Sequence, residues 1–302
     1  MSLLAVGIVL ASALLHATWN VLLSRVPKGR DASRHDQAAV GLAIGFVVWT
    51  PVALWRWQLD SGVWPYVVGS AALELTYFVL LIFAYARAPA HAVYPVARGL
   101  GPALLLPVVA VAGGGVPTLA GVGVLAISAG VLLTAWGEAD RKAVLAAIPV
   151  AVCIAAYTFL DGHGVRHADP ATYLWLTMAP VVLALLITRL VIGGLASPRF
   201  RPPGRWAALR IGSLAPLREQ LRPSTVVFGL GTFAAYGLTL LALSLVPVAQ
   251  IPAVAALRET SILFVLALSW LTARRAATKA PGAATAAGAV LVFGGVAVLA
   301  LS

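Results

Sequence analysis

The sequence predicts an all-α integral membrane protein, with ten transmembrane helices arranged as two five-helix inverted repeats. Three observations predict this fold class: the composition suits lipid, the apolar residues gather in ten runs of membrane-spanning length, and the two halves carry related motifs. Hydrophobic residues make up 61% of the 302 residues and charged residues only 10%, whereas a soluble chain is about half apolar and about a quarter charged. Because this small number of charges cannot cover the surface of a soluble fold, lipid must surround most of the chain.

The ten apolar runs are long enough to cross a bilayer, because about 20 mostly apolar residues span its hydrocarbon core. The predicted spans are 3–24, 37–56, 63–86, 91–112, 117–136, 143–162, 171–194, 224–246, 250–271 and 281–301. The runs are continuous where a barrel strand would alternate, which predicts helices rather than strands. The first run has no basic segment before it and no small-residue cleavage site after it, so we interpret it as a retained helix and not a signal peptide.

The connections differ in charge. Seventeen of the 21 basic residues lie in the odd-numbered loops or in the span ends beside them, and only Arg56 and Arg166 lie at the even-numbered ones. Since basic loops stay in the cytoplasm, this bias predicts that both termini are non-cytoplasmic, in a multi-pass protein of the inner (plasma) membrane. The longest loop, 195–223, is rich in Arg and Pro, and its middle, 206–221, could form an amphipathic surface helix.

Related motifs divide the chain into two repeats, 1–140 and 141–302, the second of which includes the basic loop 195–223. Arg98-Gly99 lies about eight residues into the fourth span, and Arg258-Glu259 lies equally deep in the ninth, 160 positions later. The fifth and tenth spans share a glycine-rich pattern, and the first and sixth match more weakly. An odd number of spans per repeat inverts the second copy, a recurring design of transporters with a midplane site. The alternative is that apolar helices resemble one another by composition alone.

Several motifs resemble the drug/metabolite transporter superfamily, EamA-type branch. They are His16-Ala17-Thr18-Trp19-Asn20 in the first span, Tyr85-Ala86-Arg87-Ala88-Pro89-Ala90 after the third, Ala256-Leu257-Arg258-Glu259-Thr260-Ser261 in the ninth, and the glycine-rich fifth and tenth spans. The resemblance implies export of a metabolite, amino acid or drug through a cavity between the two halves. Typical members have cytoplasmic termini, whereas the charge bias of this chain predicts the opposite, so the direction of transport does not carry over from the resemblance.

Four charged residues stand out deep within predicted spans: Glu74, Arg98, Arg258 and Glu259. Each costs about 2.5–3.5 kcal/mol at a helix centre, so such residues mark function by default. Adjacent side chains diverge by about 100° on a helix, so only one of Arg258 and Glu259 is expected to face the centre of a cavity. The alternative is that the four form buried ion pairs that only fix helix packing.

Polar and aromatic side chains accompany these charges at helical spacing. The complete set of candidate substrate-binding residues is His16, Trp19, Asn20, Glu74, Tyr77, Phe78, Tyr94, Arg98, Tyr157, Asp161, Tyr236, Arg258 and Glu259. Such a face could stack an aromatic substrate or hold a cationic one. Asp161 lies near a span end, which slightly favours a solvated helix cap over a cavity position. With His163 and His167 it makes only a weak metal motif, and no metal or cofactor is expected.

The function predicted from these features is secondary transport of a small metabolite by alternating access, with export as the expected direction. No Walker A motif is present, so a gradient would supply the driving force, and Glu74 or Glu259 could carry a coupling proton. The chain is not expected to be an enzyme, since His-Glu-x-x-His is absent. The basic residues behind its net charge of +11 lie in short runs between long apolar segments, so nucleic acid is not an expected partner. A flippase for a lipid-linked substrate, a receptor or an assembly subunit remain alternatives, and the chain could be a monomer or a homodimer.

Overall fold

The computed structural model describes residues 1–24, 31–195, 220–273 and 282–302. Within these ranges every regular element is a helix, and one isolated β-bridge joins Leu59 to Ala168. The helices are α1 (Leu3–Ser24), α2 (Asp31–Trp55), η1 (Ser61–Val63), α3 (Trp64–Arg87), α4 (Ala90–Val111), α5 (Thr118–Leu133), α6 (Arg141–Gly164), α7 (Pro170–Leu195), α9 (Pro223–Ser244), η3 (Val248–Gln250), α10 (Ile251–Arg258), α11 (Ser261–Ala273) and α12 (Ala283–Leu301). The predicted surface helix at 206–221 lies outside the described residues except at its last two positions.

Most of these helices suit a bilayer. In the described ranges eight helical segments are long and apolar enough to cross a membrane, and Leu3–Trp19 and Thr118–Leu133 form two shorter apolar helices. Large apolar side chains face outward, such as Val111 (89% exposed) and Phe293 (66%), as expected where lipid is the solvent. The chain is therefore a multi-pass membrane protein. The described residues also confirm the predicted all-helical class.

The ninth predicted span, 250–271, matches a membrane-spanning segment over Val248–Leu268, but the helix in this segment is interrupted. α10 ends at Arg258 and α11 begins at Ser261. At the break the Glu259 N–H donates to the Ala256 carbonyl and the Thr260 N–H to the Leu257 carbonyl, at 3.0 and 3.1 Å. These tight i→i−3 bonds, joined by the Thr260 hydroxyl, replace the α-helical pattern for one turn. The break leaves Arg258 and Glu259 at a helix end in the middle of the span.

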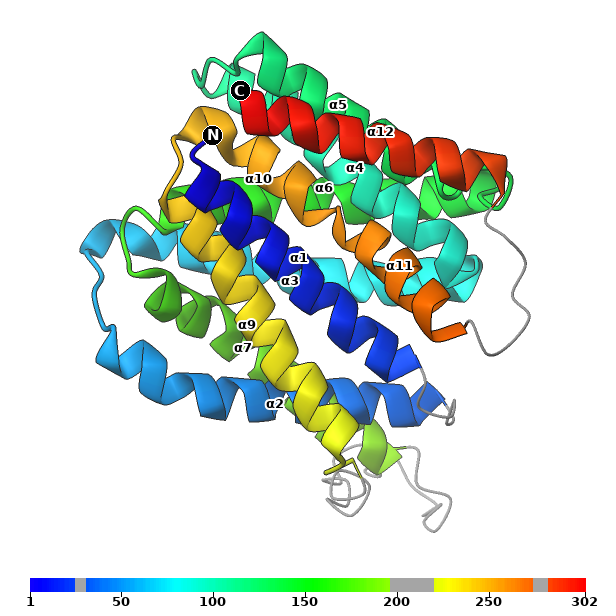
Figure 1. Ribbon diagram of the computed structural model, residues 1–302. Coiled ribbons are helices and arrows are strands. Elements are labelled where there is room, and N and C mark those ends of the chain that lie inside the picture. Colours follow the sequence, from blue (N-terminus) through cyan, green and yellow to red (C-terminus); the bar gives the residue numbers. More distant parts are fainter. Residues whose placement is uncertain (25–30, 196–219, 274–281) are drawn as a thin grey trace.

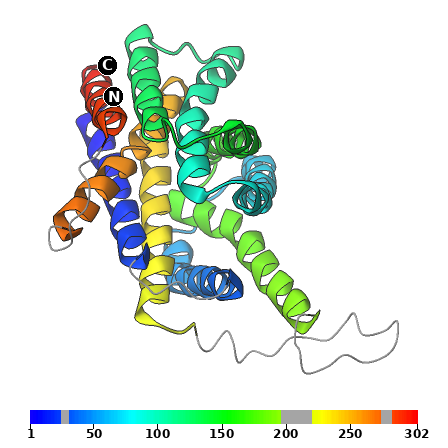
Figure 2. The same ribbon diagram turned by 90° about the vertical axis from the view of Figure 1, so that its right-hand side faces the viewer.

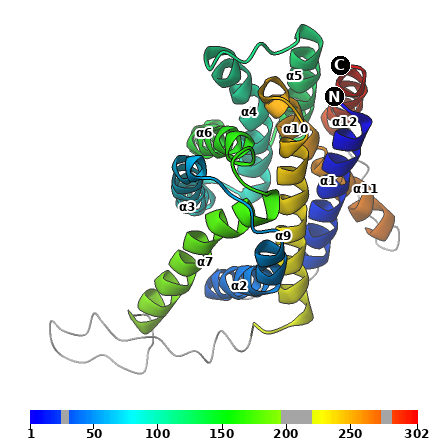
Figure 3. The same cartoon turned by 90° about the vertical axis from the view of Figure 1, so that its left-hand side faces the viewer.

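The helices pack in pairs drawn from distant parts of the sequence. α1 lies along α9, α3 packs on α6, and α5 packs on α12 at one edge of the molecule (Figures 1, 2 and 3). α2 packs on both α7 and α9, and α4 packs on α5 and α6. Both chain termini lie at the same end of the bundle (Figure 1). The interior is therefore enclosed by helices from both predicted halves.

Glycines permit the closest of these contacts. Gly41 and Gly45 of α2 face Gly229 of α9, so that a Cβ added to Gly229 would overlap the Gly41 carbonyl. A backbone atom cannot move aside as a flexible side chain can. Gly41 and Gly45 thus allow α2 to pack closely against α9.

We expect Gly229→Ala to lower the stability of the protein by about 1–3 kcal/mol, the usual cost of overpacking. Gly294→Ala is the matched control, because Gly294 is exposed and a Cβ there meets nothing within 4 Å. In an open helical position the same change is normally mildly stabilising. Thermal unfolding in detergent measures both variants. Equal midpoints would show that the α2–α9 contact is not as close as described.

Candidate functional site: a polar cavity inside the helix bundle

The bundle encloses a cavity of about 210 Å³. It is lined by His16, Trp19, Ala38, Leu42, Glu74, Tyr77, Phe78, Tyr94, Arg98, Tyr157, Met178, Phe228, Thr232, Tyr236 and Arg258. These residues come from α1, α2, α3, α4, α6, α7, α9 and the end of α10. Most of them lie in the middle of their helices or toward the ends remote from the chain termini, whereas Tyr157 and Met178 lie nearer the other end. The cavity therefore occupies the centre of the bundle and the half remote from the termini.

Ten of the thirteen candidate residues line this cavity. Asp161 and Glu259 lie behind its wall, and the side chain of Asn20 lies outside the described residues. Five lining residues were not among the candidates predicted from the sequence: Ala38, Leu42, Met178, Phe228 and Thr232. Four of them are ordinary apolar residues in apolar helices, so no signal in the sequence could have distinguished them.

Arg98 and Glu259 form a buried ion pair. The Arg98 Nε donates to Glu259 Oε2 at 2.6 Å, and the two side chains are 5% and 3% exposed. The pair joins α4 to the end of α10 and so connects the two predicted halves. Arg98 Nη2 is buried and has no hydrogen-bond partner. Glu259 is thus neutralised by a fixed partner, while Arg98 keeps one unused donor at the cavity.

Arg258 differs from its neighbour. It is half-buried, it lines the cavity, and its guanidinium carbon lies 5.5 Å from the ring centroid of Tyr236. No described carboxylate lies within ion-pair distance of it. Because Glu259 points away toward Arg98, the break after α10 presents one cation to the cavity and buries the adjacent anion.

Two carboxyl groups meet at the cavity wall through tyrosine. The Tyr236 hydroxyl lies 2.5 Å from Glu74 Oε1 and 2.6 Å from Asp161 Oδ2. Asp161 Oδ1 also accepts hydrogen bonds from the Ser70 hydroxyl at 2.6 Å and from the Tyr173 hydroxyl at 3.1 Å. The preference for a solvated cap at Asp161 was wrong, since this residue is only 1% exposed. The cause is that α6 continues to Gly164, so Asp161 lies inside the helix and faces α3, α7 and α9.

Aromatic rings form the remaining wall. The rings of His16 and Trp19 meet edge to face at 4.8 Å, and Trp19 meets Phe228 in the same way at 5.0 Å. Tyr77 approaches Tyr157 at 6.1 Å. Trp19 Nε1 is buried without a hydrogen-bond partner. The cavity thus combines a cation and a carboxyl group with broad apolar ring faces and unused N–H donors.

At the end of the bundle nearer the termini, two loops contact each other. His167 Nδ1 lies 3.0 Å from Asp60 Oδ1, and the Asp60 N–H donates to the His167 carbonyl at 2.8 Å. Arg56 and Asp169 pair at 2.8 Å across the same loops. We call these contacts, with the Leu59–Ala168 bridge, the loop clamp. It links the α2–α3 loop to the α6–α7 loop, one from each predicted half.

The Gly62 N–H and the His167 ring beside it lower the pKa of the Asp60 carboxyl below its ordinary value. A carboxylate with a lowered folded-state pKa stabilises the fold above its unfolded pKa, and this contribution is lost only as the pH falls through the folded value. The contribution of Asp60 to the loop clamp is therefore present at neutral pH. The weak metal motif has no counterpart here, since the described residues contain no group of three His, Cys, Asp or Glu placed to hold an ion.

We expect Asp60→Ala to loosen the loop clamp while leaving the cavity intact. The change removes the acceptor for Gly62 and the partner of His167. Hydrogen exchange followed by mass spectrometry should show several-fold faster exchange in peptides covering 57–63 and 165–169. Glu138→Gln, at an exposed ion pair with His91, serves as the control. Unchanged exchange in Asp60→Ala would mean that these contacts do not hold the loops together.

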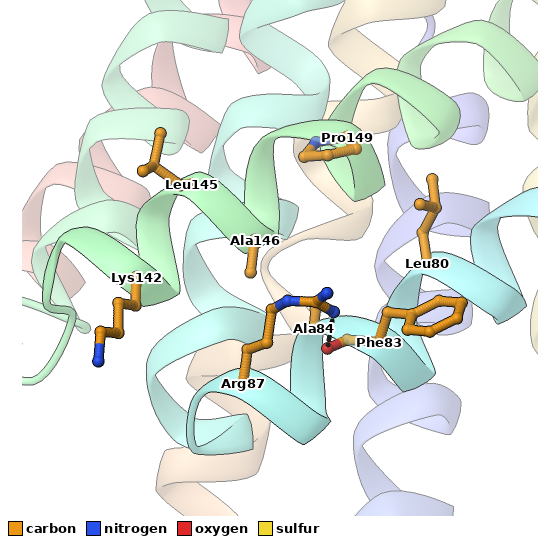
Figure 4. Close-up of a pocket in the computed structure, with 8 residues that line it drawn as sticks. All are labelled: Leu80, Phe83, Ala84, Arg87, Lys142, Leu145, Ala146 and Pro149. Carbon is orange, nitrogen blue, oxygen red and sulfur yellow. Dashed lines mark hydrogen bonds between the residues drawn. The ribbon is translucent and has the colours of Figure 1, made fainter.

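A second hollow of about 810 Å³ lies between α3 and α6, away from the cavity (Figure 4). Its lining is Leu80, Phe83, Ala84, Arg87, Lys142, Leu145, Ala146 and Pro149. Phe83 and Leu145 are more than half exposed, and Arg87 donates to the Phe83 carbonyl at 3.2 Å. It shares no lining residue with the central cavity. It is thus an apolar groove with two basic residues at one end.

Comparison with known proteins supports the fold and leaves the function open. No protein-family model matches the chain, and no curated protein matches it. Chains of solved structures do match, 28 in number. One of these, described only as "Crystal structure of protein", has 18% sequence identity and a TM-score of 0.69, with 98% of each chain covered. At this identity the likeness shows the fold alone. Fold and site together define a multi-pass helical membrane protein with a polar cavity inside the bundle.

Proposed function

We propose that this chain is a secondary transporter of the drug/metabolite transporter superfamily, EamA-type, which exports a small organic solute by alternating access. The observation that carries the proposal is the central cavity: an unpaired arginine, a carboxyl cluster and aromatic walls lie inside a bundle of apolar helices. Charged groups in the membrane are expensive and are retained where they line a solute or ion pathway. The sequence holds no nucleotide-binding loop, so the driving force would be a gradient.

The packing pattern supports ten spans in two inverted repeats. If the halves 1–140 and 141–302 are equivalent, α3 and α6 correspond to α9 and α1, and both pairs are in contact. Likewise α4 on α6 corresponds to the α10–α11 span on α1, and α5 on α12 corresponds to itself. Exchanging the halves therefore maps these pairs onto one another, which is what a pair of related repeats requires.

The cavity favours a solute that carries a carboxylate and an apolar or aromatic body. Arg258 is available to pair with an anion, and Arg98 Nη2 and Trp19 Nε1 are unused donors. Rings such as Phe78 and Phe228 would cover an apolar side chain. An amino acid fits this set, since its carboxylate could pair with Arg258 while its side chain packs on these rings.

Alternating access requires the loop clamp to open. The cavity lies toward the basic-loop end, which the charge bias places in the cytoplasm. Under this proposal the loop clamp closes the other end. Export would then bind the solute from the cytoplasm, close the basic-loop end and separate the two loops.

A thermal-shift screen of the purified protein against amino acids, amines, nucleosides and organic acids tests the solute class. A ligand at one hundred times its dissociation constant stabilises the native state by about 2.7 kcal/mol. We expect stabilisation by amino acids or other carboxylates, unchanged in the exposed-site control Glu138→Gln. If amines alone stabilise the protein, the role given to Arg258 is wrong.

The groove between α3 and α6 supports a second candidate, a flippase for a lipid-linked anionic substrate. Arg87 and Lys142 stand at one end of an apolar groove that faces outward (Figure 4), where a phosphate head group and its chain could bind. Under this hypothesis none of the water-soluble compounds raises the thermal unfolding midpoint. The double variant Arg87→Ala with Lys142→Ala then abolishes flipping of a fluorescent anionic lipid. Loss of solute stabilisation in Arg258→Ala would instead support the central cavity.

A further inference from the structure

The three oxygens that meet at Tyr236 need more hydrogens than the tyrosine can supply. A phenolic hydroxyl has one proton and can donate one hydrogen bond. Its oxygen nevertheless lies 2.5 Å from Glu74 Oε1 and 2.6 Å from Asp161 Oδ2. If both carboxyl groups were ionised, one of these two contacts would bring oxygen lone pairs together with no hydrogen between them. The geometry therefore requires one additional proton on the pair of carboxyl groups.

The partners of each carboxyl group identify which one holds that proton. Asp161 receives hydrogens on both oxygens, from Ser70 and Tyr173 on Oδ1 and from Tyr236 on Oδ2. Three donors are the environment of a carboxylate. Glu74 Oε2 is buried and has no partner. A buried oxygen without a partner costs much less on a neutral acid than on a carboxylate. Glu74 is thus the acid: its Oε1–H donates to Tyr236, and Tyr236 donates to Asp161.

The other charges around Glu74 are also consistent with one protonated carboxyl group in the Glu74–Asp161 pair. The charged and titratable groups around it are Tyr77 of α3, Asp161 and Tyr157 of α6, Tyr173 of α7, Tyr236 of α9, Tyr94 and Arg98 of α4, Arg258 and Glu259 at the end of α10, and His16 of α1. Arg98 and Glu259 neutralise each other at 2.6 Å. That leaves Arg258 as the balancing cation for one carboxylate, Asp161. A second carboxylate at Glu74 would have no counter-charge of its own.

We propose that Glu74, Tyr236 and Asp161 form a proton-binding site whose exchangeable proton resides on Glu74 and is the coupling ion of transport. Binding is the simple step in which the Glu74 carboxylate takes up one proton from water in the cavity, which Glu74 lines. Release of the proton removes the hydrogen bond that Glu74 of α3 donates to Tyr236 of α9. It also leaves the Glu74 and Asp161 carboxylates, one from each predicted half, repelling each other. Proton loss therefore favours separation of α3 from α9. The coupling rests on the proposed transport function, whereas the proton site does not.

Infrared difference spectroscopy of the purified protein, with no solute present, tests the site directly. We expect the C=O stretch of a protonated, hydrogen-bonded carboxyl group at neutral pH, shifted in D2O and absent in Glu74→Gln. The glutamine has the shape of the protonated acid and can donate to Tyr236, so this variant should fold. Tyr236→Phe should retain the band but shift it to higher frequency, because the acceptor is gone. Glu138→Gln, at an exposed site, should leave it unchanged. Absence of a band that depends on Glu74 overturns the proton site.

Coupling is tested in proteoliposomes with radiolabelled L-amino acids and small carboxylic acids. At one proton per solute, a gradient of one pH unit can sustain at most about a tenfold solute gradient, since both correspond to 1.36 kcal/mol. The wild type should accumulate solute under a pH gradient, and Glu74→Gln should exchange solute without accumulating it. Equal accumulation in both would overturn the coupling role. An intact infrared band with no flux in the wild type would instead refute the transport function and leave the proton site standing.

Discussion

Glu259→Ala is expected to destabilise the folded protein by about 3–5 kcal/mol, the cost of leaving a buried charge without its partner. Arg98 is 4% exposed, and among the described residues its carboxylate partner is Glu259 at 2.6 Å. Removing Glu259 leaves that guanidinium in a helix bundle without compensation. Thermal unfolding in detergent, followed by the fraction of monodisperse protein, measures the loss.

The double variant Arg98→Ala with Glu259→Ala is the control for this prediction. It removes both charges, so it should be less destabilised than the sum of the single variants. A buried pair often contributes little net stability compared with apolar replacements, although breaking it is costly. If the two single changes simply add, the pair is not the interaction that holds α4 against the end of α10.

Arg258→Ala is expected to weaken solute binding by about 10- to 150-fold, the equivalent of about 1.5–3 kcal/mol for a hydrogen bond to a charged group. The fold should remain intact, because Arg258 has no described ion pair to lose and is only half-buried. Binding is measured by the thermal shift as a function of solute concentration. Two adjacent residues should thus give opposite results, with Glu259 needed for folding and Arg258 for binding.

Arg258→Lys separates charge from geometry in this prediction. Lysine keeps the positive charge but lacks the planar fork that binds a carboxylate in two places. We expect it to recover part of the affinity lost in Arg258→Ala. Wild-type affinity in Arg258→Ala, with a stable fold, would show that the solute does not use this cation.

Much of the fold could be predicted from the sequence, because each span is marked by its own apolar run. The boundaries of α1 were predicted to the residue, and those of α6 within two residues. The break after α10 could not be predicted. Ala256-Leu257-Arg258-Glu259-Thr260-Ser261 contains no proline or glycine, and the turn depends on a Thr260 side-chain hydrogen bond and on the pairing of Glu259 with Arg98.

The candidate site was predictable where a residue was anomalous for its surroundings. Glu74, Arg98 and Arg258 are charges in apolar runs, and all three line the cavity. The position of Asp161 was predicted wrongly, because the predicted span ended just after it and so placed it near water. In the structure α6 extends further, and Tyr173 and Tyr236 cover Asp161. The pairing of Arg98 with Glu259 depends on how α4 packs against α10. That contact cannot be predicted from a single sequence.

The central claim is that the cavity opens alternately to the two sides of the membrane, and cysteine labelling tests it without knowledge of the solute. The chain has one cysteine, Cys153, which is buried, so Cys153→Ala provides a cysteine-free background. Thr232→Cys then places a thiol in the cavity wall. Oriented vesicles of both polarities are treated with a membrane-impermeant thiol reagent. We predict labelling from both sides, faster from the basic-loop side and accelerated on the other side by Asp60→Ala. Labelling from one side only, under every condition, would contradict a transporter and favour a receptor.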